Sequence, residues 1–185
     1  MRRFVGAVLA CGLGAVALAQ PPKAEPAKGT EVVIDGLKSV APPTWKAEKP
    51  ANRLRSYQFK LPHVPGDKED AELYVTPEQP GTLADNLAQW KDLVLPSPDR
   101  PKSDTLKEGK STVGKATLHW LDLQGTYHVK HIPIDQAVKE VKPDWRLVAV
   151  YWESKGAHSA IRLVGPRRTV EAHKAKFDEW LKNFK

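Results

Sequence analysis

The segment 146–152, RLVAVYW, places the strongest constraint on the fold of this chain. Its apolar residues occupy both odd and even positions, whereas a strand with one face in water alternates apolar and polar residues. A strand that is apolar on both faces has to be covered on both faces. The sequence therefore predicts a central strand here, in a sheet whose faces are shielded by the rest of the chain.

Other segments have the composition of strands with one face in water. Residues 31–34 are largely β-branched, and residues 54–62 and 71–76 alternate apolar with polar side chains. Residues 111–129 are expected to form one or two strands that break at Gln124–Gly125, and residues 158–165 should return beside the central strand. The turn-rich connections between these segments predict antiparallel pairing.

A first helix is predicted after residue 82. Thr82 stands three residues before Asp85, which is the spacing of a capping box. Leu83, Leu87, Trp90 and Val94 follow at spacings of four, three and four, so they share one helical face. This helix should end by Leu95, because the prolines that follow cannot continue it.

A second helix is predicted at the C-terminus, with Thr169 as its N-cap and Glu171 in its first turn. Its apolar face carries Val170, Phe177, Trp180, Leu181 and Phe184. The elements then follow the order β-β-β-α-β-β-β-α. We therefore predict an α+β fold in which a twisted antiparallel sheet of about six strands packs with two main helices.

The N-terminal segment has the layout of a secretory signal peptide. Two arginines precede the apolar run from Phe4 to Ala19, and the small residues Ala17 and Ala19 mark a cleavage site. The run is shorter than the roughly 20 residues that a membrane helix needs. Residues 1–19 are therefore expected to direct export to the periplasm or the extracellular space.

A Pro-, Ala- and Lys-rich tether follows at residues 20–30, and residues 31–185 are expected to form a single globular domain. Cys11 offers an alternative, because the residues before it resemble a lipoprotein-processing box in which this cysteine carries the lipid. The residues that follow Cys11 remain apolar, which favours cleavage after Ala19 instead. The mature chain would then contain no cysteine.

The charge of the chain limits its partners. The sequence has 29 basic and 22 acidic residues, and two of the basic ones lie in the signal segment, which leaves 27 against 22 and a net charge of +5. No dense Lys/Arg stripe of the kind found in nucleic-acid-binding proteins is present. An envelope protein or an anionic envelope polymer is the expected partner, and nucleic acid is not.

Catalytic and cofactor motifs are missing from the sequence. It contains no HExxH, no GxSxG and no glycine-rich phosphate loop, so no metal, no cofactor and no catalytic residue is predicted. The acidic cluster Asp67, Glu69, Asp70 and Glu72 lacks the spacing of a calcium loop and is interpreted as solvated charge. The alternative function is a hydrolase whose site the fold assembles around His119, His128 or His158.

The start of the last helix is one candidate binding site. Arg167, Arg168 and Thr169 follow Gly165–Pro166 and could hold an anion at a helix N-terminus. The competing interpretation is an ordinary capped helix, since Glu171 would compete with the anion and Pro166 lacks an amide donor. That interpretation is the favoured one.

Two tryptophans are further candidates for binding. Trp45 and Trp145 lie beside prolines in predicted loops, so they are the best candidates for an exposed aromatic contact. The competing and favoured interpretation is that each fills the end of the core, as large aromatic residues usually do.

The second half of the chain resembles a group of small exported bacterial proteins of unknown function. The resemblance lies in LQGTY (123–127), RLVAVYWE (146–153) and the segment from Ile161 to Lys185, IRLVGPRRTVEAHKAKFDEWLKNFK. GTLADNLAQW also resembles the helix start of that group, with Gly81, Asn86 and Trp90 in place. More distantly, the element order is similar to the PsbP-like α/β/α sandwich.

The resemblance implies a fold and an address, with little chemistry attached. Members of the PsbP-like group act as binding or assembly modules and share no catalytic residue set. The expected function is therefore that of an exported, non-enzymatic domain that binds a protein or another envelope component.

Overall fold

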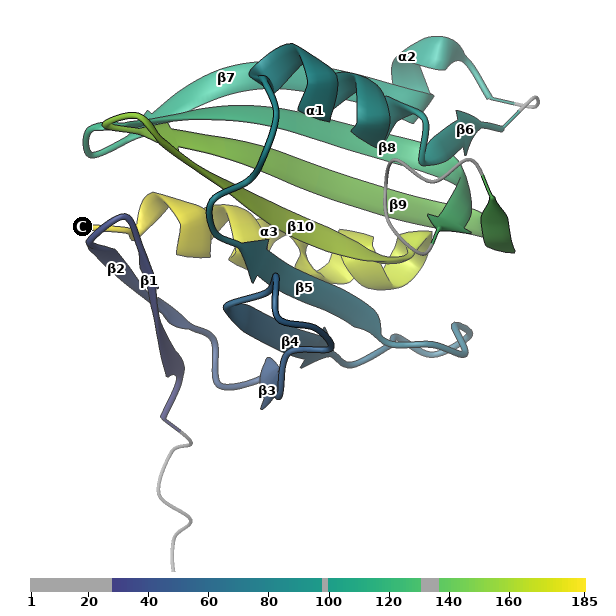
Figure 1. The fold of residues 1–185 in the computed structure, drawn as a ribbon. Helices are drawn as coiled ribbons and strands as arrows, with labels where there is room; N and C mark the ends of the chain where they lie inside the picture. The colour runs from purple at the N-terminus through teal and green to yellow at the C-terminus, as the bar shows by residue number, and fades with distance from the viewer. Residues whose placement is uncertain (1–27, 98–99, 131–136) are drawn as a thin grey trace, which may run out of the picture.

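The computed structural model describes residues 28–97, 100–130 and 137–185. The predicted signal peptide, Cys11 and most of the predicted tether lie outside the described residues. Figure 1 shows a curved antiparallel sheet with helices on both faces and a separate hairpin beside it.

The main sheet contains eight strands, and a two-stranded hairpin stands apart from it. The main sheet has the order β3-β4-β5-β10-β9-β8-β6, with β7 also paired to β8. The strands are β1 (Thr30–Ile34), β2 (Leu37–Ala41), β3 (Lys46–Glu48), β4 (Tyr57–Leu61), β5 (Ala71–Thr76), β6 (Val94–Pro96), β7 (Leu106–Val113), β8 (Ala116–Lys130), β9 (Val138–Ser154) and β10 (Ala157–Pro166). The helices are α1 (Leu83–Lys91), the short α2 (Lys102–Thr105) and α3 (Arg167–Lys182).

Strand β9 is the predicted central strand, and the structure confirms it. It lies between β10 and β8, and every residue from Leu147 to Trp152 is buried. Val148, Val150 and Trp152 belong to the core cluster that α3 covers. The residues between them face the cluster that α1 covers, so the two faces of this strand contribute to two separate cores.

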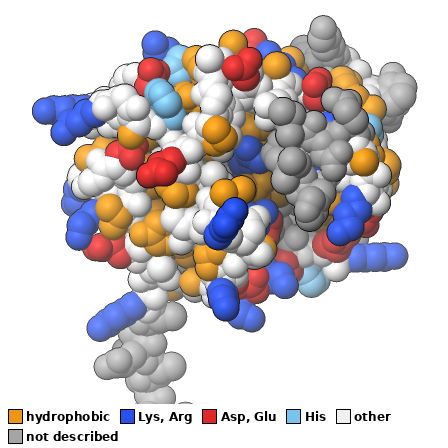
Figure 2. Space-filling model, viewed as in Figure 1, with side chains coloured by type: hydrophobic (Ala, Val, Ile, Leu, Met, Phe, Trp, Pro, Cys, Tyr) orange, Lys and Arg blue, Asp and Glu red, His pale blue; other side chains and the backbone are white. Residues whose placement is uncertain are grey.

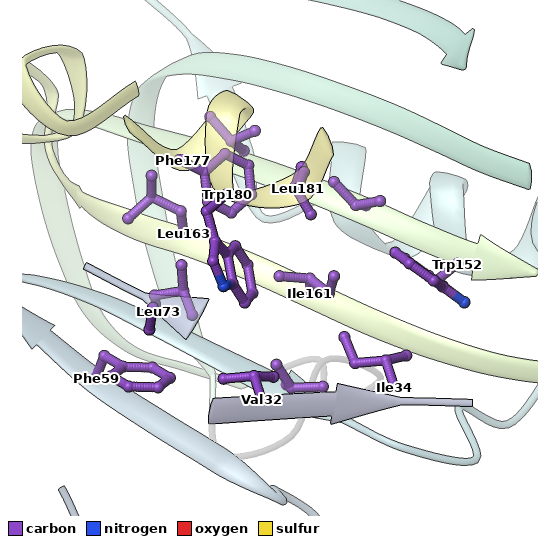
Figure 3. Packing of buried hydrophobic residues seen from close by; sticks show 14 of the residues in the cluster. Val32, Ile34, Phe59, Leu73, Trp152, Ile161, Leu163, Phe177, Trp180 and Leu181 are labelled. Atoms are coloured by element: carbon purple, nitrogen blue, oxygen red, sulfur yellow. The ribbon is translucent and has the colours of Figure 1, made fainter. Parts of the chain in front are cut away.

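The α3 side holds the larger core. In Figure 3, Phe177, Trp180 and Leu181 of α3 lie over side chains from the sheet. The β1–β2 hairpin closes the same core with Val32 and Ile34. Reciprocal backbone hydrogen bonds of 2.9 and 3.1 Å between Lys38 and Lys185 tie the hairpin to the C-terminus.

The α1 side has a smaller cover. Helix α1 has nine residues against sixteen in α3, and it buries Trp90 against Ala149 and Tyr151. The predicted capping box is present, with the Thr82 hydroxyl accepting from the Asp85 amide at 3.2 Å and the Asp85 carboxylate accepting from the Thr82 amide. Because α1 is short, part of this sheet face is left to polar and aromatic side chains.

The α+β class, the antiparallel sheet and the two main helices are confirmed, but the predicted number of strands is wrong. The described part of the chain forms ten strands rather than about six. Helix α1 ends at Lys91, and Val94 belongs to β6. The strand break predicted at Gln124–Gly125 does not occur, because β8 continues through this point with a register shift beside Gly125.

Candidate functional site

The predicted anion site at the start of α3 is filled by a carboxylate of the protein itself. Helix α3 begins at Arg167, so Thr169 is its third residue, and the prediction of Thr169 as the N-cap is wrong. Oδ2 of Asp67 accepts hydrogen bonds from the Thr169 amide at 2.9 Å and from its hydroxyl at 2.6 Å. A carboxylate at this position satisfies an orphan amide and complements the helix dipole.

The two arginines at this helix start lie apart from that bond. Nε of Arg167 donates to Asp144 at 2.8 Å, and the Arg168 guanidinium lies against the loop at Gly66. Arg168 is exposed and Thr169 is fully buried. The carboxylate of Asp67 already closes this helix start. Ligand binding by Arg167, Arg168 and Thr169 stays a prediction.

Glu171, whose side chain is 65% exposed, joins an ion pair between two buried residues instead of complementing the first turn. Arg146 on β9 forms a bidentate pair with Asp122 on β8, at 2.7 and 2.6 Å, and its Nη1 also contacts Glu171 on α3. Arg146 and Asp122 are each 7% exposed. Burial opposes the charge of Arg146, but the hydrogen bonds and charges of both carboxylates outweigh it and raise the arginine's pKa. This network joins α3 to the sheet.

The two candidate tryptophans have different environments. Trp45 is 3% exposed and packs edge-on against Phe59 and Trp180, so it fills the core as the competing interpretation stated. Trp145 on β9 is half-buried and stacks on Tyr127 at a centroid distance of 5.6 Å, with Lys142 Nζ 5.1 Å from its ring centroid. Of the two, Trp145 keeps partial access to the surface on the α1 side.

The acidic residues of the β4–β5 loop and β5 each have a partner within the protein, while Glu69 and Glu72 stay partly exposed, with 51% and 37% of their side chains accessible. Glu69 accepts hydrogen bonds from Lys142 at 2.7 and 2.8 Å, and Asp70 accepts from the backbone amide of His63 at 2.8 Å and from its ring Nδ1 at 2.7 Å. Glu72 pairs with Arg55 at 2.9 Å, and Asp67 binds Thr169 as described above. Neighbouring strands bring a donor to each carboxylate, which spacing along the chain does not show.

The histidines of the hydrolase alternative lie apart. His119 is 3.7 Å from Glu153, and the ring of His158 stacks on Tyr151 at 5.3 Å. In the described residues, neither these two nor His128 hydrogen-bonds both a hydroxyl and a carboxylate. That part of the chain also contains no group of three or more His, Cys, Asp or Glu side chains suited to a metal ion.

On the α1 side lies a buried cation that the described residues leave without a carboxylate partner, which ordinary packing does not explain. Arg162 on β10 is 6% exposed, and within the described residues it forms no ion pair. Its guanidinium carbon lies 5.0 Å from the ring centroid of Trp90 and 5.8 Å from that of Tyr74. Nη1 makes one long bond of 3.4 Å to the Tyr74 hydroxyl, and Nε has no hydrogen-bond partner.

Two further neutral side chains, Trp90 and Tyr127, lie near this cation. The indole nitrogen of Trp90 is buried and has no partner, although Trp45 and Trp180 on the other face share that property. Burial, together with the nearby Tyr74, raises the pKa of Tyr127 far above its ordinary value of 10.0, against the opposing effect of Arg162. Tyr127 therefore keeps its hydroxyl proton at physiological pH.

A second cation beside the site is neutralised within the protein. The Arg55 guanidinium lies 3.7 Å from the Tyr74 ring centroid and donates to Gln58 at 2.8 Å and to Glu72 at 2.9 Å. Figure 2 looks onto the face that carries α1 and shows blue atoms of basic side chains recessed between orange hydrophobic atoms. We refer to Arg162, Tyr74, Trp90 and Tyr127 as the Arg162 site.

No family model matches this sequence, and no curated protein matches it. Among solved structures, a protein of unknown function from Pseudomonas aeruginosa, PA94, is similar in fold, with a TM-score of 0.43 and 15% identity. The match covers 84% of this chain and 94% of that one. A likeness at this level adds nothing to the functional argument, which therefore depends on the geometry of the site.

Two cavities lie against α3, away from the Arg162 site. One, of about 310 Å³, lies between α3 and strands β7 and β8, and Trp120 and Phe177 line it. Lys174 and Asp178 at its rim pair with each other at 2.6 Å. The other, of about 350 Å³, lies between α3 and residues 42–44. Within the described part of the chain, neither cavity is lined by a buried charged group that lacks a partner.

The sequence did contain a signal for Arg162, which our reasoning missed. The segment 160–164, AIRLV, holds one basic residue in an otherwise apolar strand that returns beside the buried centre. Arginine is almost never fully buried unless it is paired, so a lone arginine there calls for either a carboxylate or a ligand. Choosing between these two needs the tertiary structure.

Within the described residues, no helix is long and apolar enough to cross a membrane.

Proposed function

We propose that this chain is an exported, non-enzymatic domain that binds an anionic component of the cell envelope through the α1 side of its sheet. Arg162 supplies the positive charge that attracts the ligand. The observation that carries the proposal is a guanidinium that is 6% exposed and lacks a carboxylate among the described residues. Burying an unpaired charge is costly, and a bound anion would remove most of that cost.

The contrast with Arg146 supports this assignment. Both arginines lie on central strands and are almost equally buried, at 7% and 6% exposure. Arg146 has two carboxylate partners, whereas Arg162 has two aromatic rings and one tyrosine hydroxyl. A buried arginine with a structural role is therefore paired in this fold, and Arg162, which has no carboxylate partner among the described residues, is suited to a ligand.

The address and the finer fold belong to the same proposal. The layout of residues 1–19 supports export, and an envelope protein or an anionic envelope polymer would be the partner met there. The α1-sheet-α3 layering is what a PsbP-like sandwich would require, and that group acts as binding or assembly modules. The mass of the mature N-terminus tests export, since cleavage after Ala19 leaves Gln20 first and lipidation leaves a modified Cys11.

The binding claim is tested by the thermal stability of the protein purified after export. Sodium chloride is replaced by sodium acetate or sodium phosphate at constant ionic strength, and the unfolding midpoint is recorded. At least one of these anions should raise the midpoint in wild type by mass action, and Arg162→Met should remove this increment. Arg100→Met, which alters a partly exposed arginine paired with Asp144, serves as the control and should retain it.

Non-specific salt effects on the midpoint would be shared by all three proteins, so the difference between variants is the relevant quantity. An increment of equal size in wild type and Arg162→Met would overturn the proposal.

A further inference from the structure

We propose that the cavity between α3 and the β7–β8 hairpin binds a small molecule with an apolar ring and one acidic group. The cavity lies on the α3 face of the main sheet, whereas the Arg162 site lies on the α1 face. The inference is therefore independent of the proposed function.

The cavity arises because α3 does not cover the whole width of the sheet. The helix packs mainly against β10, β9 and β2, so the inner face of the β7–β8 hairpin extends beyond it. The space between them has a volume of about 310 Å³, within the roughly 300–1,000 Å³ of small-molecule pockets. Close-packed protein interiors leave few voids larger than one water molecule, so this space is large enough for a ligand.

The cavity is apolar inside and reaches the surface at its rim. Its buried lining residues are Val113, Leu118, Val148, Val150, Phe177 and Leu181. Figure 3 shows Phe177 and Leu181 of α3 lying over the sheet. The lining residues Ser111 and Thr112 of β7 and Lys182 of α3 are exposed, so the cavity opens between β7 and the helix. Because the buried side chains offer no hydrogen bond, the part of a ligand that enters has to be apolar.

Trp120 gives the cavity an aromatic wall. Gly109 lies opposite Trp120 on β7, and its lack of a Cβ lets the indole lie across the β7 backbone. The half-buried indole therefore lines the cavity, and the ring of Phe177 lines it from the helix. Aromatic rings attract one another in offset and edge-on arrangements, so these two rings favour a ligand that carries a ring.

The charged residues of the lining favour one negative group on the ligand. Lys174 and Asp178 pair with each other at 2.6 Å, which occupies the carboxylate that lines the cavity. Lys182 also lines it, is exposed, and forms no ion pair within the described part of the chain. An acidic group at the mouth would lie beside this lysine while the ring enters the cavity.

The inference is tested with probes that share a phenyl ring and a short chain but differ in charge: phenylpropionate, phenylpropanamide and phenylpropylammonium. The purified mature protein is titrated at pH 7 and constant ionic strength, and the ¹⁵N-resolved Trp120 indole N–H signal, assigned with Trp120→Phe, is recorded. Phenylpropionate should shift this signal and bind about threefold more tightly than the amide, which should bind about threefold more tightly than the ammonium probe. The steps are small because an exposed ion pair adds little affinity. Acetate should bind at least about 100-fold more weakly than phenylpropionate, since it lacks the ring.

Two pairs of variants make the result specific to the cavity. Ser111→Phe places a ring at the mouth and should abolish the shift, whereas Lys110→Phe adds the same ring on the opposite face of β7 and should leave binding unchanged. Lys182→Glu should reverse the order of the three probes. Lys176→Glu makes the same change of charge on α3 outside this cavity and should preserve the order. Lys182 is exposed, so its replacement tests the inference even if Ser111→Phe fails to fold.

Three results would overturn the inference. Ammonium binding as tight as phenylpropionate binding, or an unchanged order in Lys182→Glu, would remove the acidic group. No shift of the Trp120 signal by any probe, or wild-type binding in Ser111→Phe, would show that the cavity is not a ligand site. Arg162→Met should keep the phenylpropionate shift, and its loss there would place the ligand on the other face of the sheet.

Discussion

Asp67 is the residue that most clearly joins local structure to tertiary structure. It lies in the β4–β5 loop, yet its carboxylate closes the start of α3, 102 positions away in the sequence. One side chain therefore satisfies a helix amide, complements the helix dipole and fixes the loop against the helix. The Val64 amide donates to the Thr169 hydroxyl at 3.3 Å and adds a second link between the same segments.

We expect Asp67→Ala to lower the free energy of unfolding by about 1–2 kcal/mol, the usual loss when a capping acceptor is removed. Asp67→Asn keeps an acceptor and should lose less. Urea denaturation followed by tryptophan fluorescence measures both variants. An alanine variant as stable as wild type would mean that water replaces this cap at no cost.

Asp70 gives a prediction for the dependence of stability on pH. Hydrogen bonds from the His63 ring and then from its backbone amide hold the pKa of Asp70 below its ordinary value of 3.8. A carboxyl whose pKa is lower in the folded state than in the unfolded state stabilises the fold at pH values above its unfolded-state pKa. This contribution is lost as the pH falls through the folded-state pKa. Wild type should therefore exceed Asp70→Asn in stability by a full margin at about pH 5, and the margin should shrink as pH falls below 3.8.

Urea titrations of the two proteins at a series of pH values measure this margin. A margin that is unchanged between about pH 5 and pH 3 would show that the His63–Asp70 pair does not form in solution.

The β7–β8 hairpin shows how one glycine shapes an element. Gly109 on β7 faces Trp120 on β8, and a Cβ at Gly109 would lie 2.4 Å from the indole ring. The indole therefore lies across the β7 backbone in space that glycine leaves open, and it packs against the α3-side core. Glycine is required here for close approach rather than for an unusual backbone angle.

We expect Gly109→Ala to destabilise the protein by about 1–3 kcal/mol, as overpacking usually does. Trp120→Leu combined with Gly109→Ala should cost less than the sum of the single changes, since the smaller side chain relieves the clash. Ser111→Ala, on the same exposed strand, is the control. Additive losses in the double variant would show that the two residues do not meet.

The spacing of apolar residues predicted the long helices and strands correctly, but it did not predict where they end. The alternation in residues 71–76 predicted β5 with its observed bounds, and the two-parity pattern predicted the buried centre of β9. Val94 kept the helical spacing but lies in β6, because Asp92 caps the helix before that residue is reached. Strands of three residues, such as β3, are too short for a period to be detected.

Gly125 misled the prediction in another way. It was expected to break the strand, but β8 continues through it with a φ of 157°, which residues with a side chain rarely adopt, and a Cβ there would lie 2.0 Å from the Leu95 carbonyl oxygen. Glycine at this position permits close approach of β6 to β8. A sequence pattern does not distinguish a glycine kept for a turn from one kept for a neighbouring backbone.

Two buried arginines, Arg146 and Arg162, lie on opposite faces of the main sheet, and they differ in their partners. Sequence analysis could identify both as basic residues within apolar strands, but it could not show which one a carboxylate would meet. Asp122 lies on the neighbouring strand β8 and faces Arg146, whereas the neighbours of Arg162 on its own face are aromatic. The candidate site therefore depends on strand order, which sequence periodicity does not supply.

This difference predicts opposite effects on stability. Replacing Arg146 leaves Asp122 buried and unpaired, whereas replacing Arg162 removes a charge that no carboxylate of the described residues pairs, and loses its contacts with Trp90 and Tyr74. Where a residue is retained for binding at the expense of stability, its replacement by a suitable apolar side chain is expected to stabilise the ligand-free protein.

The most direct test of Arg162 as the anion-binding group is the free energy of unfolding of ligand-free Arg162→Met, measured beside that of Arg146→Met. We predict a loss of about 3–5 kcal/mol for Arg146→Met, and for Arg162→Met no loss or a gain of up to about 2 kcal/mol. Equal and large losses in both variants would show that Arg162 is a structural residue, and they would contradict its assignment as the anion-binding group.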